Sequence, residues 1–278
     1  MVATAEAAPL DREFEWADAD FQRVQALIYK RAGISLHDGK HAMVYSRLSR
    51  RLRDTGHRSF SAYLSWLESH EGAEWQEFIN ALTTNLTSFF RESHHFEILH
   101  TLLAAKPTGT RWNVWCNAAS TGEEPYSIVM TAIEALGNTA SFKLSASDID
   151  SKVLAIASEG VYKLESIKGL DQQRMQRFFL RGKASNAGLV RVKPELKTPI
   201  DFLSVNLIQD NWPFREQFDI VFCRNVMIYF DAPTQRRVLE RIYRNMKPGG
   251  MLFVGHSENF NDSRDLFTLR GKTVYERC

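Results

Sequence analysis

From Arg111 onward, short strand-like runs alternate with helical stretches, and this alternation limits the fold more than any other feature. Strand, helix, strand, repeated, predicts a parallel sheet wrapped by helices. The predicted strands are Trp112–Cys116, Phe142–Ser147, Ile200–Val205, Phe218–Cys223 and Met251–Gly255. The predicted helices are Pro125–Leu136, Ser151–Ser158 and Pro233–Met246, the last stopped by Pro248-Gly249-Gly250.

Two further segments complete this α/β region. A hairpin is predicted at the end of the chain, from Leu266–Arg270 and Thr273–Arg277 around Gly271-Lys272. A small antiparallel insertion is expected between Arg177 and Leu196, about residues 177–198 as a subdomain.

The first third of the chain shows only helical periodicity. Stops are expected at Gly33 and Gly56, and Trp75, Phe78, Ile79 and Leu82 form a further apolar stripe. The sequence therefore predicts a loose tail over residues 1–18, which lacks the pattern of a signal peptide, a helical domain over 19–90, and the sheet domain over 91–278.

Basic residues are concentrated in this helical part. Residues 21–60 hold nine Lys or Arg against Asp38 and Asp54, although the whole chain carries only +2. Such a segment predicts an acidic partner. The arginines of the second helix have only Asp54 as an obvious partner within it; they are Arg47, Arg50, Arg51 and Arg53.

Composition excludes several classes of protein. No run approaches the roughly 18 apolar residues that span a membrane, so a soluble, cytoplasmic protein without membrane insertion is expected. Cys116, Cys223 and Cys278 form no CxxC pair, which disfavours disulfides and structural zinc. His94 and His95 are adjacent on a helix and expected to face apart, so no metal is predicted.

Polar turns follow the first two predicted strands, where open α/β sheets bind ligands. Small residues and Gly122 follow the first strand and permit close backbone approach, while Asp148 and Asp150 follow the second. Asp148 can accept ribose hydroxyls, and Asp150 is expected to cap the next helix. Because the turn is neither a P-loop nor GxGxxG, phosphate binding is not expected, and nucleoside binding stays open on spacing alone.

Four longer motifs resemble those of one family. They are NLTSFFRE at 85–92, WCNAASTGEEPYS at 115–127, FCRNVMIYFD at 222–231 and GHSENF at 255–260. They occur in the same order in the chemotaxis receptor methyltransferases, the CheR family, and the resemblance runs from about residue 20 to the end. It implies a class I methyltransferase-like, Rossmann-like sheet with a C-terminal antiparallel hairpin, preceded by an all-helical domain.

The resemblance also implies a cofactor site for S-adenosylmethionine, released as S-adenosylhomocysteine. Asn85, Thr87 and Arg91 are expected at the methionine part of the cofactor. Glu123 and Asp148 are expected at its amino-acid and ribose ends. The adenine and sulfonium side is expected to be lined by Asn206, Leu207, Arg224 and Asn225, with Tyr229 near the methyl group.

The implied reaction esterifies glutamate side chains of chemoreceptors in bacterial chemotaxis. A glutamate with a pKa of about 4.3 is already ionised at pH 7, so no general base is needed. We expect Arg91 and Tyr229 to act as the catalytic residues, by holding a carboxylate and by placing a polar or aromatic group at the sulfonium.

The implied partners are the acidic methylation helices of the receptors, docked on Arg47, Arg50, Arg51 and Arg53. A receptor C-terminal peptide at the 177–198 subdomain is a further implied partner, with recruitment to membrane receptor arrays and a monomeric enzyme. Two alternatives stay open: a nucleic-acid methyltransferase, which the modest net charge and lack of interleaved aromatics disfavour, and a non-enzymatic receptor-docking adaptor.

Overall fold

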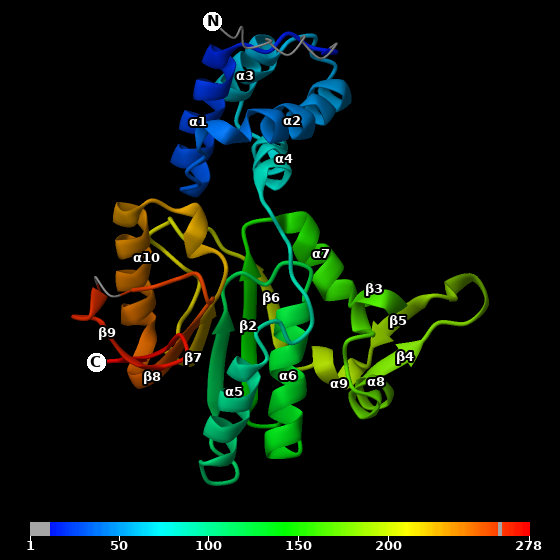
Figure 1. Cartoon of the computed structure of the whole chain (residues 1–278), viewed down its shortest axis with the longest axis vertical. Coiled ribbons are helices and arrows are strands. Elements are labelled where there is room, and N and C mark those ends of the chain that lie inside the picture. Colours follow the sequence, from blue (N-terminus) through cyan, green and yellow to red (C-terminus); the bar gives the residue numbers. More distant parts are fainter. Residues whose placement is uncertain (1–11, 261–262) are drawn as a thin grey trace, which may run out of the picture. The chain divides into compact units, whose positions relative to one another are not determined.

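The computed structural model describes residues 12–260 and 263–278, and the chain forms two compact units that meet between Thr83 and Thr84 (Figure 1). Over these ranges, no helix is both long and apolar enough to cross a membrane. The division lies ahead of the boundary predicted after residue 90. Residues 84–90 belong to the second unit because Phe89 packs in its core against Tyr162 and Phe179.

The first unit is built of helices. As predicted, the first two helices end at Gly33 and Gly56, which adopt the left-handed conformation that favours glycine. The elements are α1 (Asp18–Ala32), η1 (Asp38–Lys40), α2 (His41–Thr55), α3 (Phe60–Ser69) and α4 (Ala73–Leu82).

Residues 12–18 are packed more closely than the loose tail predicted over 1–18. Residues 1–11 lie outside the described part, but the next few residues pack on the first unit. Trp16 contacts Phe60 with ring centroids 4.4 Å apart, and Phe14 meets the same ring edge-on at 6.3 Å. The tail prediction was wrong over these residues because aromatic side chains gain from burial against the helices.

The second unit contains a seven-stranded sheet of order β6-β2-β1-β7-β8-β10-β9. The first five strands are parallel, whereas β10 pairs antiparallel with both β8 and β9. This order, with its C-terminal antiparallel hairpin, confirms the predicted fold class. The strands are β1 (Trp112–Cys116), β2 (Phe142–Asp148), β6 (Ile200–Ser204), β7 (Phe218–Cys223), β8 (Met246–Val254), β9 (Phe267–Gly271) and β10 (Val274–Arg277).

Both faces of this sheet are covered, so its central strands are apolar throughout. Val114 and Cys116 of β1 join the core beneath α5 (His94–Ala104) and α6 (Glu123–Leu136). Trp115 points to the opposite face, where it joins the core that includes side chains of α10 (Ala232–Asn245). Helix α7 (Ser151–Glu159) leads from β2 and packs along β2 and β6.

The last parallel strand begins earlier than predicted. Pro248-Gly249-Gly250 was expected to stop the preceding helix, but α10 ends at Asn245 and β8 begins at Met246. Phe218 pairs with Met246 and Ile220 with Met251, so residues 247–250 form an irregularity within the strand.

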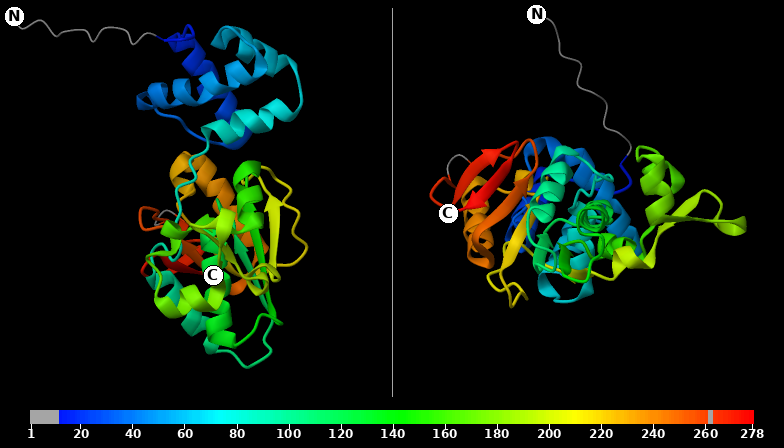
Figure 2. Two further views of the ribbon diagram at one scale, coloured as in Figure 1. Left: turned by 90° about the vertical axis from the view of Figure 1, so that its right-hand side faces the viewer. Right: turned by 90° about the horizontal axis from the view of Figure 1, so that it is seen from below.

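The predicted antiparallel insertion is present as a three-stranded sheet of order β3-β5-β4. It lies at the opposite end of the unit from β9 and β10 (Figures 1 and 2). Its first strand was missed because it is only three residues long and precedes the insertion. The remaining elements are β3 (Val161–Lys163), η2 (Leu164–Ile167), α8 (Gln172–Phe178), β4 (Phe179–Arg181), η3 (Ala184–Asn186), β5 (Leu189–Val192), α9 (Pro194–Lys197) and η4 (Met227–Tyr229).

Candidate functional site

The carboxyl ends of β1, β2 and β7 bring the predicted polar turns together at one edge of the sheet. The turn after β1 is held against the end of β2, since Ser120 N donates to Asp148 Oδ2 at 2.8 Å. Gly122 has a φ of +100°, and a Cβ there would lie 2.7 Å from the Tyr162 hydroxyl and 2.9 Å from the Ala157 Cβ. Only glycine therefore fits this turn.

Asp148 is a buried carboxylate whose two oxygens each accept a backbone N–H, from Ser120 and from Asp150. Burial raises its pKa to about 6, against these hydrogen bonds. No cation among the described residues pairs with it. A carboxylate has about four acceptor sites, so these bonds leave acceptor capacity for the hydroxyls of a ligand.

Asp150 has the capping role that the sequence predicts. Its carboxylate accepts from Lys152 N at 2.9 Å and from Val153 N at 3.3 Å, at the start of α7. It also accepts from Asn85 Nδ2 at 2.8 Å, and the Asn85 carbonyl accepts from the Ser120 hydroxyl at 2.8 Å. Asn85 thus joins the segment before α5 to both turns of the site.

Glu123 is a second buried carboxylate, at the start of α6. Its side chain accepts one hydrogen bond, from the Thr121 hydroxyl at 2.6 Å, and burial raises its pKa against this bond. Within the described part of the chain it has no ion-pair partner. A buried carboxylate without a cation favours a positively charged ligand.

The segment carrying Thr87 and Arg91 crosses the same edge. Arg91 Nη1 donates to the Leu86 carbonyl at 2.9 Å, and Thr87 is half-buried on the loop between them. Two residues of this segment, Phe90 and Glu92, have positive φ angles of 52° and 57°. Bulky residues rarely adopt this conformation unless their surroundings hold them there.

The loop after β7 carries Asn225 and Tyr229. Asn225 has a φ of 57°, and its N–H donates to Glu258. Glu258 is buried and also accepts the N–H groups of Gly255, Val226 and Met227 at 2.6–3.0 Å. The half-buried Tyr229 directs its hydroxyl toward the Thr84 carbonyl at 3.5 Å.

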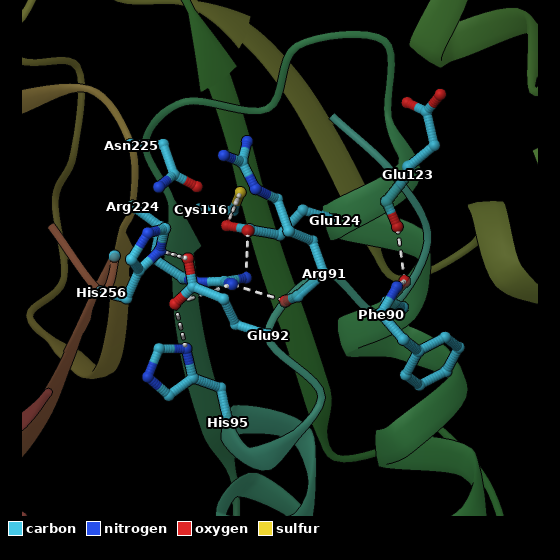
Figure 3. A network of polar contacts seen from close by, with 12 residues as sticks. Phe90, Arg91, Glu92, His95, Cys116, Glu123, Glu124, Arg224, Asn225 and His256 are labelled. Atoms are coloured by element: carbon cyan, nitrogen blue, oxygen red, sulfur yellow. Dashed lines mark hydrogen bonds and ion pairs between the residues drawn. The ribbon is translucent and has the colours of Figure 1, made fainter. Parts of the chain in front are cut away.

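Arg224, expected along the adenine and sulfonium side, has partners within the protein, and its contact with the cofactor stays a prediction. Its side chain is fully buried and makes an ion pair with Glu124 at 2.5 Å. Glu92 lies 3.4 Å from the same guanidinium, which also donates to the Arg91 carbonyl (Figure 3). The guanidinium is therefore held inside the protein by acidic and carbonyl partners, which the sequence did not reveal.

Asn206 and Leu207 follow β6 beside Asp148, because Val205 N donates to the Asp148 carbonyl at 3.1 Å. The Asn206 side chain accepts from Ile208 N at 3.2 Å. Leu207 is buried in the core on the α10 side of the sheet. These residues thus lie at the predicted edge of the sheet, and their contacts with adenine stay a prediction.

This donor set suits S-adenosylmethionine. Two buried carboxylates that have no cation among residues 12–260 and 263–278 match the ribose hydroxyls and the positive charge of this molecule, and Arg91 offers a cation for its carboxylate. A phosphate would meet like charge here. The fit therefore favours a sulfonium nucleoside over a nucleotide.

Cofactor affinity should depend on pH through Asp148. A ligand that uses its ionised form binds more weakly as the pH falls through about 6, because only about a tenth of such a group is ionised at pH 5. Protonation of Glu123, whose pKa is also raised, acts in the same direction. Calorimetry with S-adenosylhomocysteine should show Kd rising about tenfold from pH 7.5 to pH 5. A constant Kd over this range would contradict the assignment.

The histidines at the start of α5 do not face apart as expected. The rings of His94 and His95 lie 4.2 Å apart, and ligand atoms of both lie within 4.8 Å of a Glu92 oxygen. However, Arg224 and His256 already contact the Glu92 carboxylate. The expectation that the protein uses no metal stays a prediction.

The arginines of α2 have more partners than the sequence indicated. Arg51 forms a two-pronged ion pair with Glu74 of α4, at 2.9 and 2.6 Å, and lies 3.4 Å from Glu77. Arg47 donates to the Thr83 carbonyl, and Arg53 pairs with Glu13. Arg50 is exposed and, within residues 12–260 and 263–278, has no ion-pair partner.

These contacts predict different outcomes for two neighbouring arginines. Arg51→Ala should lower the free energy of unfolding by about 2 kcal/mol, because Glu74 and Glu77 lose a charged partner at a partly buried position. Arg50→Ala should leave the denaturant midpoint unchanged. Urea titration of both variants measures the difference, and equal midpoints would contradict it.

Sheet order and site together define a class I methyltransferase. Two family models match the chain: "CheR methyltransferase, SAM binding domain" over residues 85–276 and "CheR methyltransferase, all-alpha domain" over residues 19–83. The chain therefore belongs to the CheR methyltransferase family and is an S-adenosylmethionine-dependent methyltransferase.

Relatives of similar length support this placement. A "Chemotaxis protein methyltransferase" of Klebsiella aerogenes is 53% identical, over 96% of this chain and 92% of the relative. A relative of the same name from Escherichia coli is 51% identical, over 93% of this chain and 91% of the relative. A "Chemotaxis protein methyltransferase 2" of Pseudomonas aeruginosa is 48% identical over 95% of both chains.

Proposed function

We propose that this protein transfers the methyl group of S-adenosylmethionine to glutamate side chains of chemoreceptors, forming glutamyl methyl esters. The names of the relatives support a role in chemotaxis. The observation that carries the proposal is the pair of buried carboxylates without cations, Glu123 and Asp148, beside an arginine-bearing segment at the strand ends. The resemblance to CheR proteins supplies the receptor and the ester chemistry.

The bound cofactor supplies an electrophilic methyl group. Asp148 holds the ribose, Glu123 attracts the positive charge of the cofactor, and the Ser120–Gly122 turn permits their close approach. Arg91 holds a carboxylate in a fixed direction, and Tyr229 places its ring and hydroxyl near the methyl group. Since the accepting glutamate is already ionised, these residues act by placement and by excluding water rather than by removing a proton.

Arg50 is the arginine of α2 most available to an acidic receptor helix. Arg50→Glu should reduce kcat/KM for receptor methylation and leave S-adenosylhomocysteine affinity unchanged, because charge complementarity acts mainly on encounter. The other three arginines have partners within the protein, which limits their part in docking; they are Arg47, Arg51 and Arg53. Because these arginines have internal partners, less basic surface is free than the sequence indicated. This also makes a nucleic-acid methyltransferase a weaker alternative.

The three-stranded sheet offers a second contact for a receptor. Strand β4 pairs on one side only, with β5, and Leu180 in it is half exposed. An extended receptor C-terminal peptide would add as a further strand along β4. Recruitment in this manner would place the enzyme at receptor arrays on the cytoplasmic side of the membrane.

The proposal is tested by transfer of tritiated methyl from S-adenosylmethionine to purified receptor cytoplasmic fragments. The label should be released as methanol by mild base, as from an ester. Receptor fragments with the methylated glutamates changed to alanine serve as the control and should take up no label. Base-stable label, or label on RNA but not on receptors, would overturn the proposal.

A further inference from the structure

Arg91 lies between two residues held in an unfavourable backbone conformation. Phe90 and Glu92 have φ angles of 52° and 57°, in the left-handed region that residues with a Cβ rarely adopt. Such a conformation persists only where surrounding contacts hold it in place. Both neighbours of Arg91 have such contacts.

Phe90 is held on one side. Its N–H donates to the Ser127 hydroxyl of α6 at 3.0 Å, its ring meets Phe96 edge-on at 5.0 Å, and the Arg174 guanidinium stacks over it at 4.1 Å. The aromatic ring is thereby fixed between α5, α6 and α8.

Glu92 is held on the other side through its carboxylate. One oxygen lies 3.0 Å from His256 Nδ1, and the other lies 3.4 Å from buried Arg224 and 3.7 Å from His95 Nδ1 (Figure 3). Burial alone would raise the pKa of Glu92, but the His256 contact and the Arg224 charge hold it at about 2. The carboxylate is thus ionised and anchored at neutral pH.

Arg224 also contacts the main chain of Arg91. Arg224 donates to the Arg91 carbonyl while it binds Glu92 and Glu124. The backbone of Arg91 is therefore fixed from both sides, and its side chain is left to project over the strand ends.

We propose that Glu92 is a positioning residue for Arg91: its carboxylate, bound to Arg224 and His256, fixes the strained backbone that presents the Arg91 guanidinium to the site. This inference rests on the role proposed above for Arg91. It adds a residue whose carboxylate contacts Arg224 and His256.

A double-mutant cycle tests this coupling. Glu92→Gln keeps the shape of the side chain but removes its charge. If Arg91→Ala raises the Kd of S-adenosylhomocysteine, Glu92→Gln should raise it too. If Arg91→Ala lowers the kcat of receptor methylation, Glu92→Gln should lower it too. We expect a loss of about tenfold, equivalent to one charge-assisted hydrogen bond. In the Arg91→Ala background the same change should alter that parameter by less than about twofold.

Two further variants separate positioning from general stability. Glu92→Gly relieves the left-handed strain yet removes the carboxylate, so it should lose activity as Glu92→Gln does, with a melting temperature no lower than that of Glu92→Gln. Glu97→Gln, an exposed change on the following helix α5, should behave as wild type. Wild-type activity in Glu92→Gln, or an equal loss with and without Arg91, would overturn the inference.

The outcomes also distinguish this inference from the proposed function. If Arg91→Ala changes neither parameter, the roles of Arg91 and Glu92 both fail, although receptor methylation by the wild type would stand. If receptor methylation is absent, the cycle can still be read from S-adenosylhomocysteine affinity alone.

Discussion

Replacing Asp148 with alanine should weaken S-adenosylhomocysteine binding by at least about a hundredfold and abolish methyl transfer at ordinary cofactor concentrations. Hydrogen bonds to a charged group contribute about 1.5–3 kcal/mol each, and the carboxylate is expected to accept two from the ribose. The substitution also leaves the buried N–H groups of Ser120 and Asp150 without their acceptor. The lost ribose contacts and the unpaired N–H groups both weaken the cofactor site.

Calorimetry with S-adenosylhomocysteine measures the effect. Asp201→Ala is a matched control, since this aspartate lies on neighbouring β6 but is exposed and pairs with Lys143 at 3.3 Å. The control should bind as wild type. An affinity of Asp148→Ala within about fivefold of wild type would remove Asp148 from the cofactor site.

The second large effect is expected on stability, from Arg224→Met. This change keeps an unbranched side chain but leaves Glu124 and Glu92 without their buried cation. Breaking a buried ion pair by removing one partner costs about 3–5 kcal/mol. The free energy of unfolding at pH 7 should fall by this amount.

A compensating change and a pH series identify the cause. Arg224→Met with Glu124→Gln should recover part of the loss, because the uncompensated charge is removed. The loss arises from buried negative charge without a cation, so it should be full at pH 7 and shrink as carboxylates take up protons toward about pH 4.3. A loss below 1 kcal/mol, flat with pH, would contradict the account.

Much of the sheet could be predicted because its signals are local. Strands β1 and β7 have the predicted limits, since short apolar runs bounded by polar turns mark buried parallel strands. The capping role of Asp150 was likewise readable, because it depends only on the next three residues.

What was missed depends on contacts between distant segments. The partners of Arg51 and Arg224 lie 23 and 100 residues away, so neither ion pair could be read from the sequence. The left-handed φ at Phe90 and Glu92 has no sequence signal, since neither residue favours it. Glu258 stood in a motif, but its four backbone donors appear only in three dimensions.

The roles of the site residues could be predicted in part. The motifs assigned them by resemblance, and the fold brings Asn85, Ser120, Asp148 and Asp150 into direct contact. Tyr229 joins them only through the Thr84 carbonyl. Their contacts with cofactor and substrate stay predictions.

A crystal structure with S-adenosylhomocysteine tests the central claim most directly. We expect both ribose hydroxyls within hydrogen-bond distance of the Asp148 carboxylate, and the amino group beside Glu123. A nucleoside bound elsewhere, with Asp148 and the turn at Ser120 facing only solvent, would contradict the account.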